Sequence, residues 1–257
     1  MLGTREILRL SVADRLKPVH AVGSYAVIDH STATRLGQRV DENTELPSFA
    51  GLEGDYRKTR WASETMMRRA QARGLPVFLH RMSLLCGDTG SGLADPGEIA
   101  WRLAHAMIVT GSAPKSARPL DMLPIDAGVN AMLALARDPD AAPCVNHIIG
   151  DRSLSWGDLA EALRHLGHAI EELPSPEWYG RVRHWAERHP EDASIVGLMP
   201  LFNEGGNDHA VFFSVDGSLT RNRLEARGID RRPADIGDLI RTLTYLTRTG
   251  ALPEARV

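Results

Sequence analysis

The chain has 257 residues, of which 43% are hydrophobic and 25% charged, and its net charge is −3. This is the composition of a globular protein, and its evenly mixed charges argue against a nucleic-acid-binding patch or a polybasic membrane-binding stretch. The two cysteines, Cys86 and Cys144, are too few for a disulfide framework, so we expect a reducing, cytoplasmic compartment.

The first third of the chain alternates predicted helices with predicted strands that are rich in small, apolar and β-branched residues. The predicted elements are a helix over residues 3–16, a strand over 19–28, a helix over 55–73 and a strand over 76–85. His80 and Arg81 interrupt the apolar run of the second strand, which excludes a membrane span there. Helices and strands at this spacing predict a doubly wound α/β architecture.

Beyond Gly92 the pattern becomes mostly helical. Helices are predicted over residues 95–111, 125–137 and 156–166 and from residues 175 and 233 onward, with a short strand over 145–149 and an extended segment over 209–213. Ser155 is the predicted N-cap of the third of these helices. We therefore predict two domains, residues 1–92 and residues 93–257.

The chemistry-bearing motif lies at the start of the helix over residues 55–73. Tyr56 and Arg60 are four residues apart and so share one helix face. A cation beside a tyrosine stabilises the phenolate, lowers the tyrosine pKa and favours general-acid catalysis. Such a pair is common on helices, and the catalytic interpretation gains weight from its setting between two buried strands. Ser24, on the first strand, is placed to hold the same carbonyl oxygen.

The segment GDYRKTRWASETMMRRAQARGLPVFLHRMSLLCGDTGSG resembles the thioester-reductase domains of nonribosomal-peptide and polyketide assembly lines and of carboxylic acid reductases. These are extended short-chain dehydrogenase/reductases, whose pattern is Gly-Tyr-x-x-Ser-Lys-Trp, a Gly-Leu-Pro turn and a Gly-Asp-x-x-x-Gly loop. The segments VNHIIGDRSLSWGDLAEALRHLGHAIEELPSPEWYGRV and RTLTYLTRTGALP resemble later parts of the same domains. The resemblance extends over nearly the whole chain.

The resemblance implies roles for three residues. Ser24 and Tyr56 align with the catalytic hydroxyl and tyrosine, and Arg60 stands where the family has its lysine. In the family this tyrosine and lysine also hold the nicotinamide end of NADPH. The implied reaction is reductive release, as an aldehyde or alcohol, of an acyl or peptidyl chain from the phosphopantetheine of a carrier protein. No metal is expected, because the ten histidines do not form a metal-binding pattern.

Two departures from the family pattern matter. Arg60 keeps the positive charge but cannot give up its proton as lysine does, so we expect weakened reduction. The family's glycine-rich turn, which binds the cofactor pyrophosphate after the first strand, is missing, and the glycines of residues 87–92 follow the wrong strand. We therefore expect a partial Rossmann-like parallel sheet that lacks its N-terminal strands, plus a mostly helical lobe that binds substrate and carrier protein.

Other interpretations remain open at this point. A missing N-terminal segment or another chain would complete the sheet, and the sequence alone does not choose between a fragment, a natural truncation and a partner chain. A redox-inactive relative would release product by Dieckmann-type cyclisation, without nicotinamide. A non-catalytic module would use the C-terminal lobe to dock a carrier protein. A nucleotide-sugar epimerase or dehydratase shares the tyrosine helix but not the helices of this lobe.

Overall fold

The computed structural model describes residues 2–28, 40–52, 54–116, 119–138, 142, 144–150, 153–202, 215–229 and 231–255. The chain folds into two compact units. The first consists of Met1–Ser83, Gly128–Ile149 and Phe213–Arg231, and the second of Leu84–Ala127, Gly150–Phe212 and Arg232–Val257. Each unit is assembled from separate stretches of the sequence, and the domain boundary expected between residues 92 and 93 stays a prediction.

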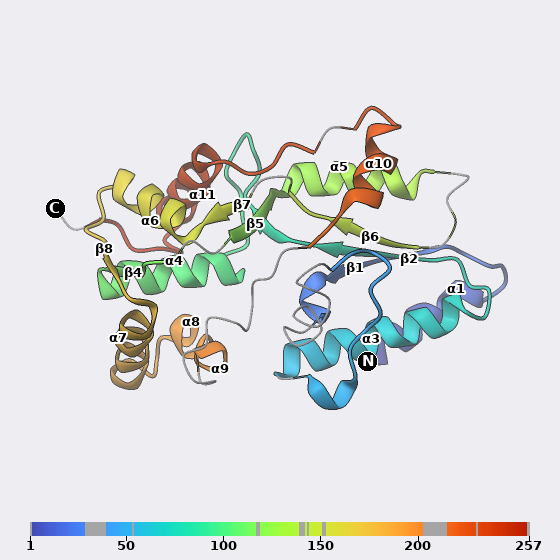
Figure 1. Cartoon of the computed structure of the whole chain (residues 1–257), viewed down its shortest axis with the longest axis horizontal. Coiled ribbons are helices and arrows are strands. Elements are labelled where there is room, and N and C mark those ends of the chain that lie inside the picture. Colours follow the sequence, from blue (N-terminus) through green and yellow to red (C-terminus); the bar gives the residue numbers. More distant parts are fainter. Residues whose placement is uncertain are drawn as a thin grey trace. The chain divides into compact units, whose positions relative to one another are not determined.

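A parallel sheet of three strands forms the centre of the first unit (Figure 1). In spatial order its strands are β1 (Val19–Ser24), β2 (Val77–Met82) and β6 (Val145–Ile148). In the register of the sheet, Val19 lies opposite Val77, and Leu79 lies opposite Val145. Parallel strands covered by helices confirm the α/β class that the sequence predicted.

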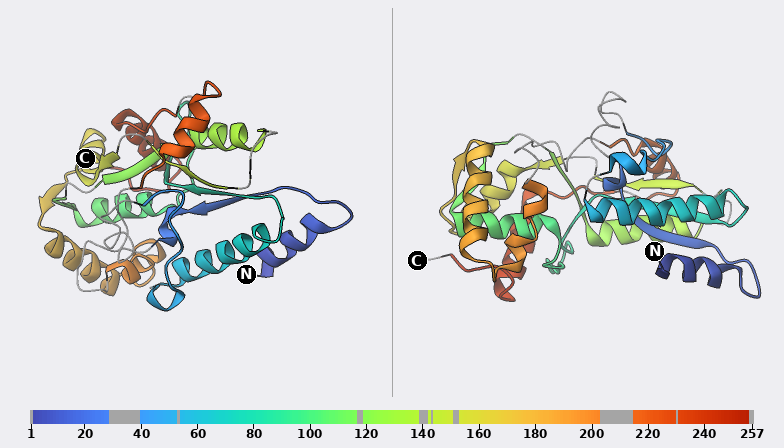
Figure 2. Two further views of the ribbon diagram at one scale, coloured as in Figure 1. Left: turned by 45° about the vertical axis from the view of Figure 1, so that its right-hand side comes forward. Right: turned by 90° about the horizontal axis from the view of Figure 1, so that it is seen from below.

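Helices cover both faces of this sheet. The helices are α1 (Leu2–Val12), α3 (Asp55–Gln71), α10 (Ser218–Glu225) and the part of α5 (Ile125–Ala136) that follows Ala127. α1 and α3 lie side by side on one face, and α5 lies over the other (Figures 1 and 2). Leu75, Val77 and Leu79 form the core beneath α3, where Met67 and Ala70 of the helix pack against them.

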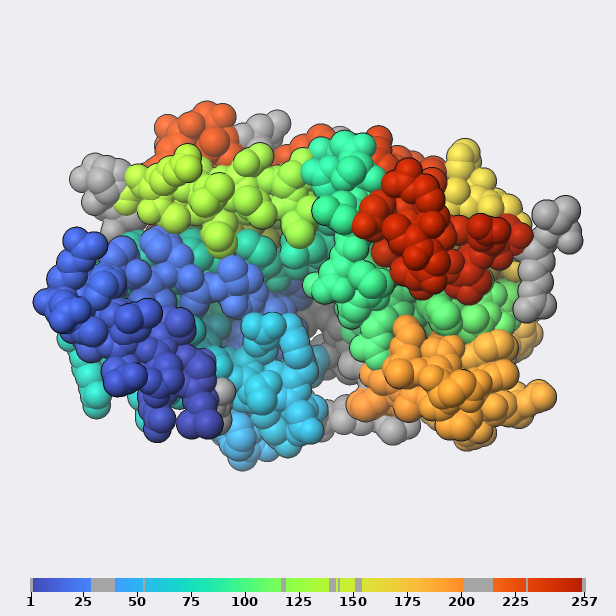
Figure 3. Space-filling view, turned by 180° about the vertical axis from the view of Figure 1, so that it is seen from behind, coloured from blue at the N-terminus to red at the C-terminus, as the bar shows by residue number. Residues whose placement is uncertain are grey.

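β1 stands at the end of the strand order, so one of its edges is unpaired within the part of the chain that the structure describes. Val22 of this strand is 54% exposed. In the space-filling view of Figure 3, the N-terminal segments (blue) lie next to α5 (lime) at the surface. Large apolar side chains are also exposed along α1 and just after it: Leu2, Ile7, Leu10, Val12 and Leu16.

The second unit contains short strands among several helices. β3 (Leu84–Cys86) pairs in parallel with β5 (Pro119–Pro124), which pairs antiparallel with β7 (Ser153–Ser155), and β4 (Ser112–Pro114) pairs in parallel with β8 (Glu171–Leu173). The helices include α4 (Ile99–Thr110), α6 (Trp156–His165), α7 (Ser175–Arg188), α8 (Ala193–Val196), α9 (Met199–Phe202) and α11 (Ile236–Arg248). Their apolar faces meet in one large core that contains Trp101, Trp156 and Trp178.

Several predicted elements have different ends in the structure. The strand expected over residues 76–85 is divided at Ser83 into β2 and β3, which belong to different sheets. The strand expected over residues 19–28 ends at Ser24, where a 3-10 helix, η1 (Tyr25–Val27), begins. α4 begins at Ile99 instead of residue 95, after a segment of turns. The extended segment expected over residues 209–213 lies outside the described residues.

The predicted N-cap of α6 is present. Ser155 forms a capping box with Asp158 at the start of α6, because each side chain accepts the other residue's backbone N–H. Gly167, just past the end of α6, has a φ of 91°, a backbone conformation that glycine adopts without a steric penalty. Among the described residues no helix combines the length and apolar character that crossing a membrane requires.

Candidate active site

The first two turns of α3 present Tyr56 and Arg60 together at the surface. Gly54, with a φ of 73°, leads into the helix, and Asp55 places a carboxylate in its first turn. The Arg60 guanidinium carbon lies 5.2 Å from the centroid of the Tyr56 ring, so the cation sits over the aromatic face. Tyr56 is 55% exposed, which leaves the phenol open to a ligand. The predicted pairing of these two side chains is present in the structure.

Ser24 ends β1 and caps η1. Its hydroxyl oxygen accepts a hydrogen bond from the Ala26 backbone N–H at 3.2 Å. Tyr25 and Val27 of η1 are buried, and α3 packs against both η1 and β1. The structure thus places Ser24 where β1 meets α3, in the same unit as Tyr56. Among the described contacts no hydrogen bond joins Ser24 to Tyr56 or Arg60, so their shared catalytic role stays a prediction.

Trp61 fixes the segment in front of α3. Its indole N–H donates to the Pro47 carbonyl oxygen at 2.8 Å, and its ring lies 5.1 Å, centroid to centroid, from that of Phe49. The same side chain packs against the buried cluster that includes Tyr25 and Val27. One tryptophan therefore joins the loop before the helix to the residues that follow Ser24.

A buried ion pair connects α3 to β2, and no local sequence pattern predicts it. Glu64 accepts two hydrogen bonds from Arg81, at 2.6 Å and 3.2 Å, and one from Arg68 at 2.9 Å. Arg81 is fully buried, and Glu64 is 6% exposed. Although burial alone would raise the pKa of Glu64, the charges and hydrogen bonds of Arg81 and Arg68 hold it below its usual value.

His147 of β6 extends this network across the sheet. Its Nε2 lies 3.1 Å from Arg81 Nη1, and its Nδ1 lies 2.9 Å from the carbonyl oxygen of Asp216. The carbonyl can only accept, so Nδ1 carries the proton and Nε2 accepts from Arg81. Burial, together with the Arg81 charge, lowers the pKa of His147 and keeps the ring neutral.

A pair of histidines, His20 and His80, lies on the other face of the sheet. His20 Nδ1 lies 3.1 Å from His80 Nε2, and the His20 ring stacks on Phe78 at a centroid distance of 4.6 Å. His80 also lies 3.4 Å from the Asn146 amide nitrogen. Burial, and to a lesser extent the charge of His20, lowers the pKa of His80 to about 4. Both rings are therefore neutral at physiological pH, and they serve packing and hydrogen bonding.

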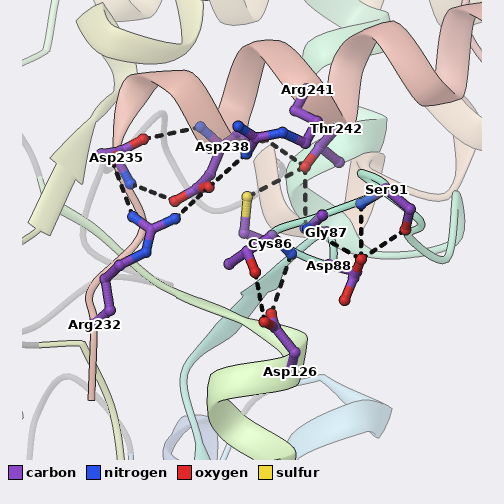
Figure 4. A network of polar contacts seen from close by, with 12 residues as sticks. Cys86, Gly87, Asp88, Ser91, Asp126, Arg232, Asp235, Asp238, Arg241 and Thr242 are labelled. Atoms are coloured by element: carbon purple, nitrogen blue, oxygen red, sulfur yellow. Dashed lines mark hydrogen bonds and ion pairs between the residues drawn. The ribbon is translucent and has the colours of Figure 1, made fainter. Parts of the chain in front are cut away.

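The Gly-Asp-x-x-x-Gly loop is held against α11 in the second unit (Figure 4). Asp88 Oδ1 accepts hydrogen bonds from the backbone N–H groups of Gly90 and Ser91 and from the Ser91 hydroxyl. The Ser91 hydroxyl contributes most to keeping the pKa of Asp88 below its usual value. Because this carboxylate already occupies the loop amides, they are not free to bind a phosphate group.

The two outer glycines of this loop touch α11 too closely for any side chain. A Cβ on Gly87 would lie 2.5 Å from the Gly92 carbonyl oxygen and 2.6 Å from Thr242 Oγ1. A Cβ on Gly92 would lie 2.5 Å from the Arg241 carbonyl oxygen, and Gly92 has a φ of 73°. The two glycines of the motif are therefore explained by the close packing of this loop against α11.

Polar contacts also join this loop to α11 (Figure 4). Thr242 donates to the Asp238 carbonyl oxygen and accepts from Gly87 N–H, and its hydroxyl lies 3.4 Å from Cys86 Sγ. Burial raises the pKa of Cys86 to about 11, so its thiol is protonated at neutral pH. Cys86 is 2% exposed, so its thiol packs as a small buried side chain. Among the described residues no group of three or more metal-ligating side chains could hold a metal ion.

The fold and the family match define the class of protein. A parallel sheet covered by helices is typical of the Rossmann-like short-chain dehydrogenase/reductases. Residues 1–132 match the family described as Male sterility protein, an NAD-binding family, and the chain belongs to that family.

Curated relatives agree with this membership. The chain is 28% identical over 258 residues to a component of the linear gramicidin synthase of Brevibacillus parabrevis, a match covering 98% of this chain and 5% of that protein. It is 29% identical to the isonitrile lipopeptide synthase of Streptomyces coeruleorubidus, covering 97% of this chain and 17% of that protein. The chain thus spans a small part of these relatives.

Solved structures show the same fold. The terminal R domain of the myxalamid PKS-NRPS pathway matches with a TM-score of 0.86 and 24% identity, over 99% of this chain and 64% of that one. A thiolation-reductase di-domain of an archaeal non-ribosomal peptide synthetase matches with a TM-score of 0.75 and 20% identity, covering 96% and 52%. A dTDP-glucose 4,6-dehydratase of Bacillus anthracis, in complex with NAD, matches with a TM-score of 0.64 and 14% identity, covering 98% and 69%. The predicted resemblance to assembly-line reductase domains is confirmed.

Proposed function

We propose that this chain is the catalytic part of an NADPH-dependent thioester reductase, which releases an acyl or peptidyl chain from a carrier protein as an aldehyde or alcohol. The observation that carries the proposal is the exposed Tyr56 phenol with the Arg60 guanidinium 5.2 Å from its ring centroid. The names of the relatives, which include synthases and an aminoadipate reductase, support the same substrate class.

The proposed chemistry assigns one task to each of three side chains. Tyr56 donates its proton to the thioester carbonyl oxygen, and Arg60 stabilises the phenolate that remains. The Ser24 hydroxyl donates its proton in a hydrogen bond to the same carbonyl oxygen, while the Ser24 oxygen accepts from the Ala26 backbone N–H. NADPH, when bound, supplies the hydride. The carbon–sulfur bond then breaks, and the hydroxyl proton of the reduced carbon ends on the departing phosphopantetheine thiol, which leaves the aldehyde. Tyr56 and Arg60 fit the nicotinamide-ribose end of the cofactor, because both are exposed polar groups in the first two turns of α3.

The pyrophosphate of the cofactor needs a partner that the described residues do not provide. The backbone N–H groups of Gly90 and Ser91 donate to Asp88, and within the described residues β1 has one edge without a partner strand. We propose that a further segment of polypeptide, or another chain, pairs with β1 and brings the phosphate-binding turn. The free thiols of Cys86 and Cys144 support a reducing, cytoplasmic setting.

The carrier protein is the proposed macromolecular partner. One structure of the same fold is a thiolation-reductase di-domain, which favours a carrier that presents phosphopantetheine to this chain. We assign that contact to residues 93–257, the domain predicted to bind substrate. A docking module without chemistry would still bind carrier after Tyr56→Phe and Ser24→Ala, and binding together with loss of turnover in those variants supports the enzyme.

Product analysis with and without nicotinamide tests the proposal. The full-length polypeptide, meaning residues 1–257 together with the segment or chain proposed to pair with β1, is incubated with an acyl-pantetheine thioester. Mass spectrometry identifies the released product. We expect an aldehyde or alcohol only when NADPH is present. Release of a cyclised product without any nicotinamide would instead identify the Dieckmann-type reaction and overturn the reductase assignment.

A further inference from the structure

Polar residues recur at four-residue spacing along α3, namely Tyr56, Arg60, Glu64 and Arg68. Eight residues span just over two helical turns, so Glu64 lies about two turns along the helix from Tyr56 and roughly 80° around it. Tyr56 is therefore exposed while Glu64 is buried. Glu64 is also the only residue of α3 that is buried. The deepest anchor of this helix is therefore a carboxylate, whereas an amphipathic helix ordinarily buries an apolar stripe.

Arg81 binds this carboxylate by donating two hydrogen bonds to it. Its Nη2 and Nε atoms donate to the two oxygens of Glu64, at 2.6 Å and 3.2 Å. A two-point contact between planar groups fixes direction as well as distance, which a single bond or an apolar contact does not. Arg81 belongs to β2, the strand next to β1, so the contact sets the rotation and depth of α3 relative to the sheet.

The guanidinium itself is held from the other side. Its Nη1 donates to His147 Nε2 at 3.1 Å, and His147 is bonded in turn to the Asp216 carbonyl oxygen. The backbone N–H of His147 donates to Thr220 Oγ1, and that hydroxyl donates to Glu42. Arg81 therefore has its orientation imposed by β6 and by the segment that enters α10.

A buried ion pair of this kind adds little stability over an apolar pair of the same volume, but it specifies one arrangement. We propose that Glu64 and Arg81 are positioning residues, which hold α3 so that Tyr56 and Arg60 meet the substrate carbonyl beside Ser24. This inference rests on the proposed reductase function. Neither residue touches the reacting atoms, so their effect passes through the placement of the helix.

The test compares four variants of the full-length polypeptide. Glu64→Gln removes the charge at nearly constant shape, and Glu64→Asp keeps the charge on a shorter arm. Arg81→Lys keeps the charge but loses the two-point contact. Leu135→Ala is the control, because it removes a buried side chain from α5, on the opposite face of the sheet from α3. Each folded variant is assayed for kcat and KM with NADPH and an acyl-pantetheine thioester.

We expect Glu64→Gln and Arg81→Lys to lower kcat on the order of 100-fold, the effect of displacing a catalytic group by about 1 Å. KM should change by less than about threefold, because binding groups remain in place. Glu64→Asp should recover part of kcat, and Leu135→Ala should keep the wild-type value. A folded Glu64→Gln with wild-type kcat overturns the proposal. If that variant does not fold, wild-type kcat in both Glu64→Asp and Arg81→Lys overturns it equally.

A second measurement separates this proposal from the reductase assignment. If the wild-type polypeptide shows no NADPH-dependent turnover, the proposed function has failed, and hydrogen–deuterium exchange of the peptide spanning residues 54–60 then decides. Faster exchange there in Glu64→Gln, but not in Leu135→Ala, supports the placement of α3 by the ion pair. Equal exchange in both variants contradicts it.

Discussion

Arg60 is the residue at which this chain leaves the family pattern, and it gives the first prediction. Its guanidinium stacks on Tyr56 and keeps a positive charge there, but it cannot release a proton as lysine does. We expect Arg60→Lys to raise kcat for NADPH-dependent reduction, by about tenfold if one proton-transfer barrier falls by about 1.4 kcal/mol.

The second unit supplies a matched control for that substitution. Arg248 lies 5.9 Å from the ring centroid of Tyr245 on α11, which repeats the arginine-over-tyrosine contact away from the proposed site. Arg248→Lys should leave kcat unchanged. A fall in kcat for Arg60→Lys would show that this site has adapted to arginine.

His80 predicts how stability depends on pH. Its folded-state pKa is about 4 against an ordinary value of 6.5, so the unfolded chain binds more protons between these two values. The stability is therefore intact above pH 6.5 and falls as the pH drops toward 4, by roughly 3 kcal/mol from this residue. Urea unfolding at pH 7 and pH 4.5 measures the loss. His80→Gln should reduce the pH dependence, whereas the same change at the exposed His165 should not.

Some residues of the candidate site could be predicted from the sequence, and others could not. Tyr56 and Arg60 follow from helical periodicity, because both partners lie within one turn of one helix. Glu64 and Arg81 are 17 residues apart in different elements, and pairing across a fold leaves no local pattern. Arg81 was interpreted as an interruption of an apolar strand, yet the structure buries it fully because Glu64 and His147 satisfy its charge and its donors.

The loop of residues 87–92 and α11 behave as one packed element, which gives a prediction for glycine. A methyl group at Gly87 or Gly92 collides with backbone atoms that cannot move independently. We expect Gly87→Ala and Gly92→Ala each to lower the free energy of unfolding by about 2 kcal/mol or more. Gly90→Ala is the control, because its nearest neighbour would be a side-chain oxygen at 3.5 Å. Equal free energies of unfolding for all three variants would contradict the close packing of this loop against α11.

Elements with a local signal were predicted well, and those set by pairing were not. α6 was predicted with its N-cap Ser155, because a capping box is written in four consecutive residues. β4 and β5 contain prolines at Pro114, Pro119 and Pro124, which argue against strands in a sequence. The structure tolerates them because each stands at the first or last position of its strand. The division of the 76–85 strand at Ser83 likewise depends on partners from distant parts of the chain.

In the proposed function, a further segment or another chain pairs with β1 and binds the cofactor pyrophosphate. NADPH should therefore bind residues 1–257, expressed alone, about 100-fold or more weakly than it binds the full-length polypeptide, because two or more charge-assisted hydrogen bonds are missing. Fluorescence titration of NADPH measures both affinities. Equally tight binding by both would show that the pyrophosphate is held by residues of this chain.

In the proposed reaction, the Tyr56 phenol donates the proton during NADPH-dependent thioester reduction. The direct test is the single-turnover rate of NADPH oxidation with an acyl-pantetheine thioester, in the wild-type full-length polypeptide, in Tyr56→Phe and in the matched Tyr245→Phe. We predict that Tyr56→Phe loses about 10²- to 10⁴-fold in rate, as expected for the loss of a general acid, while Tyr245→Phe retains the wild-type rate. A Tyr56→Phe variant that oxidises NADPH at the wild-type rate would contradict the account.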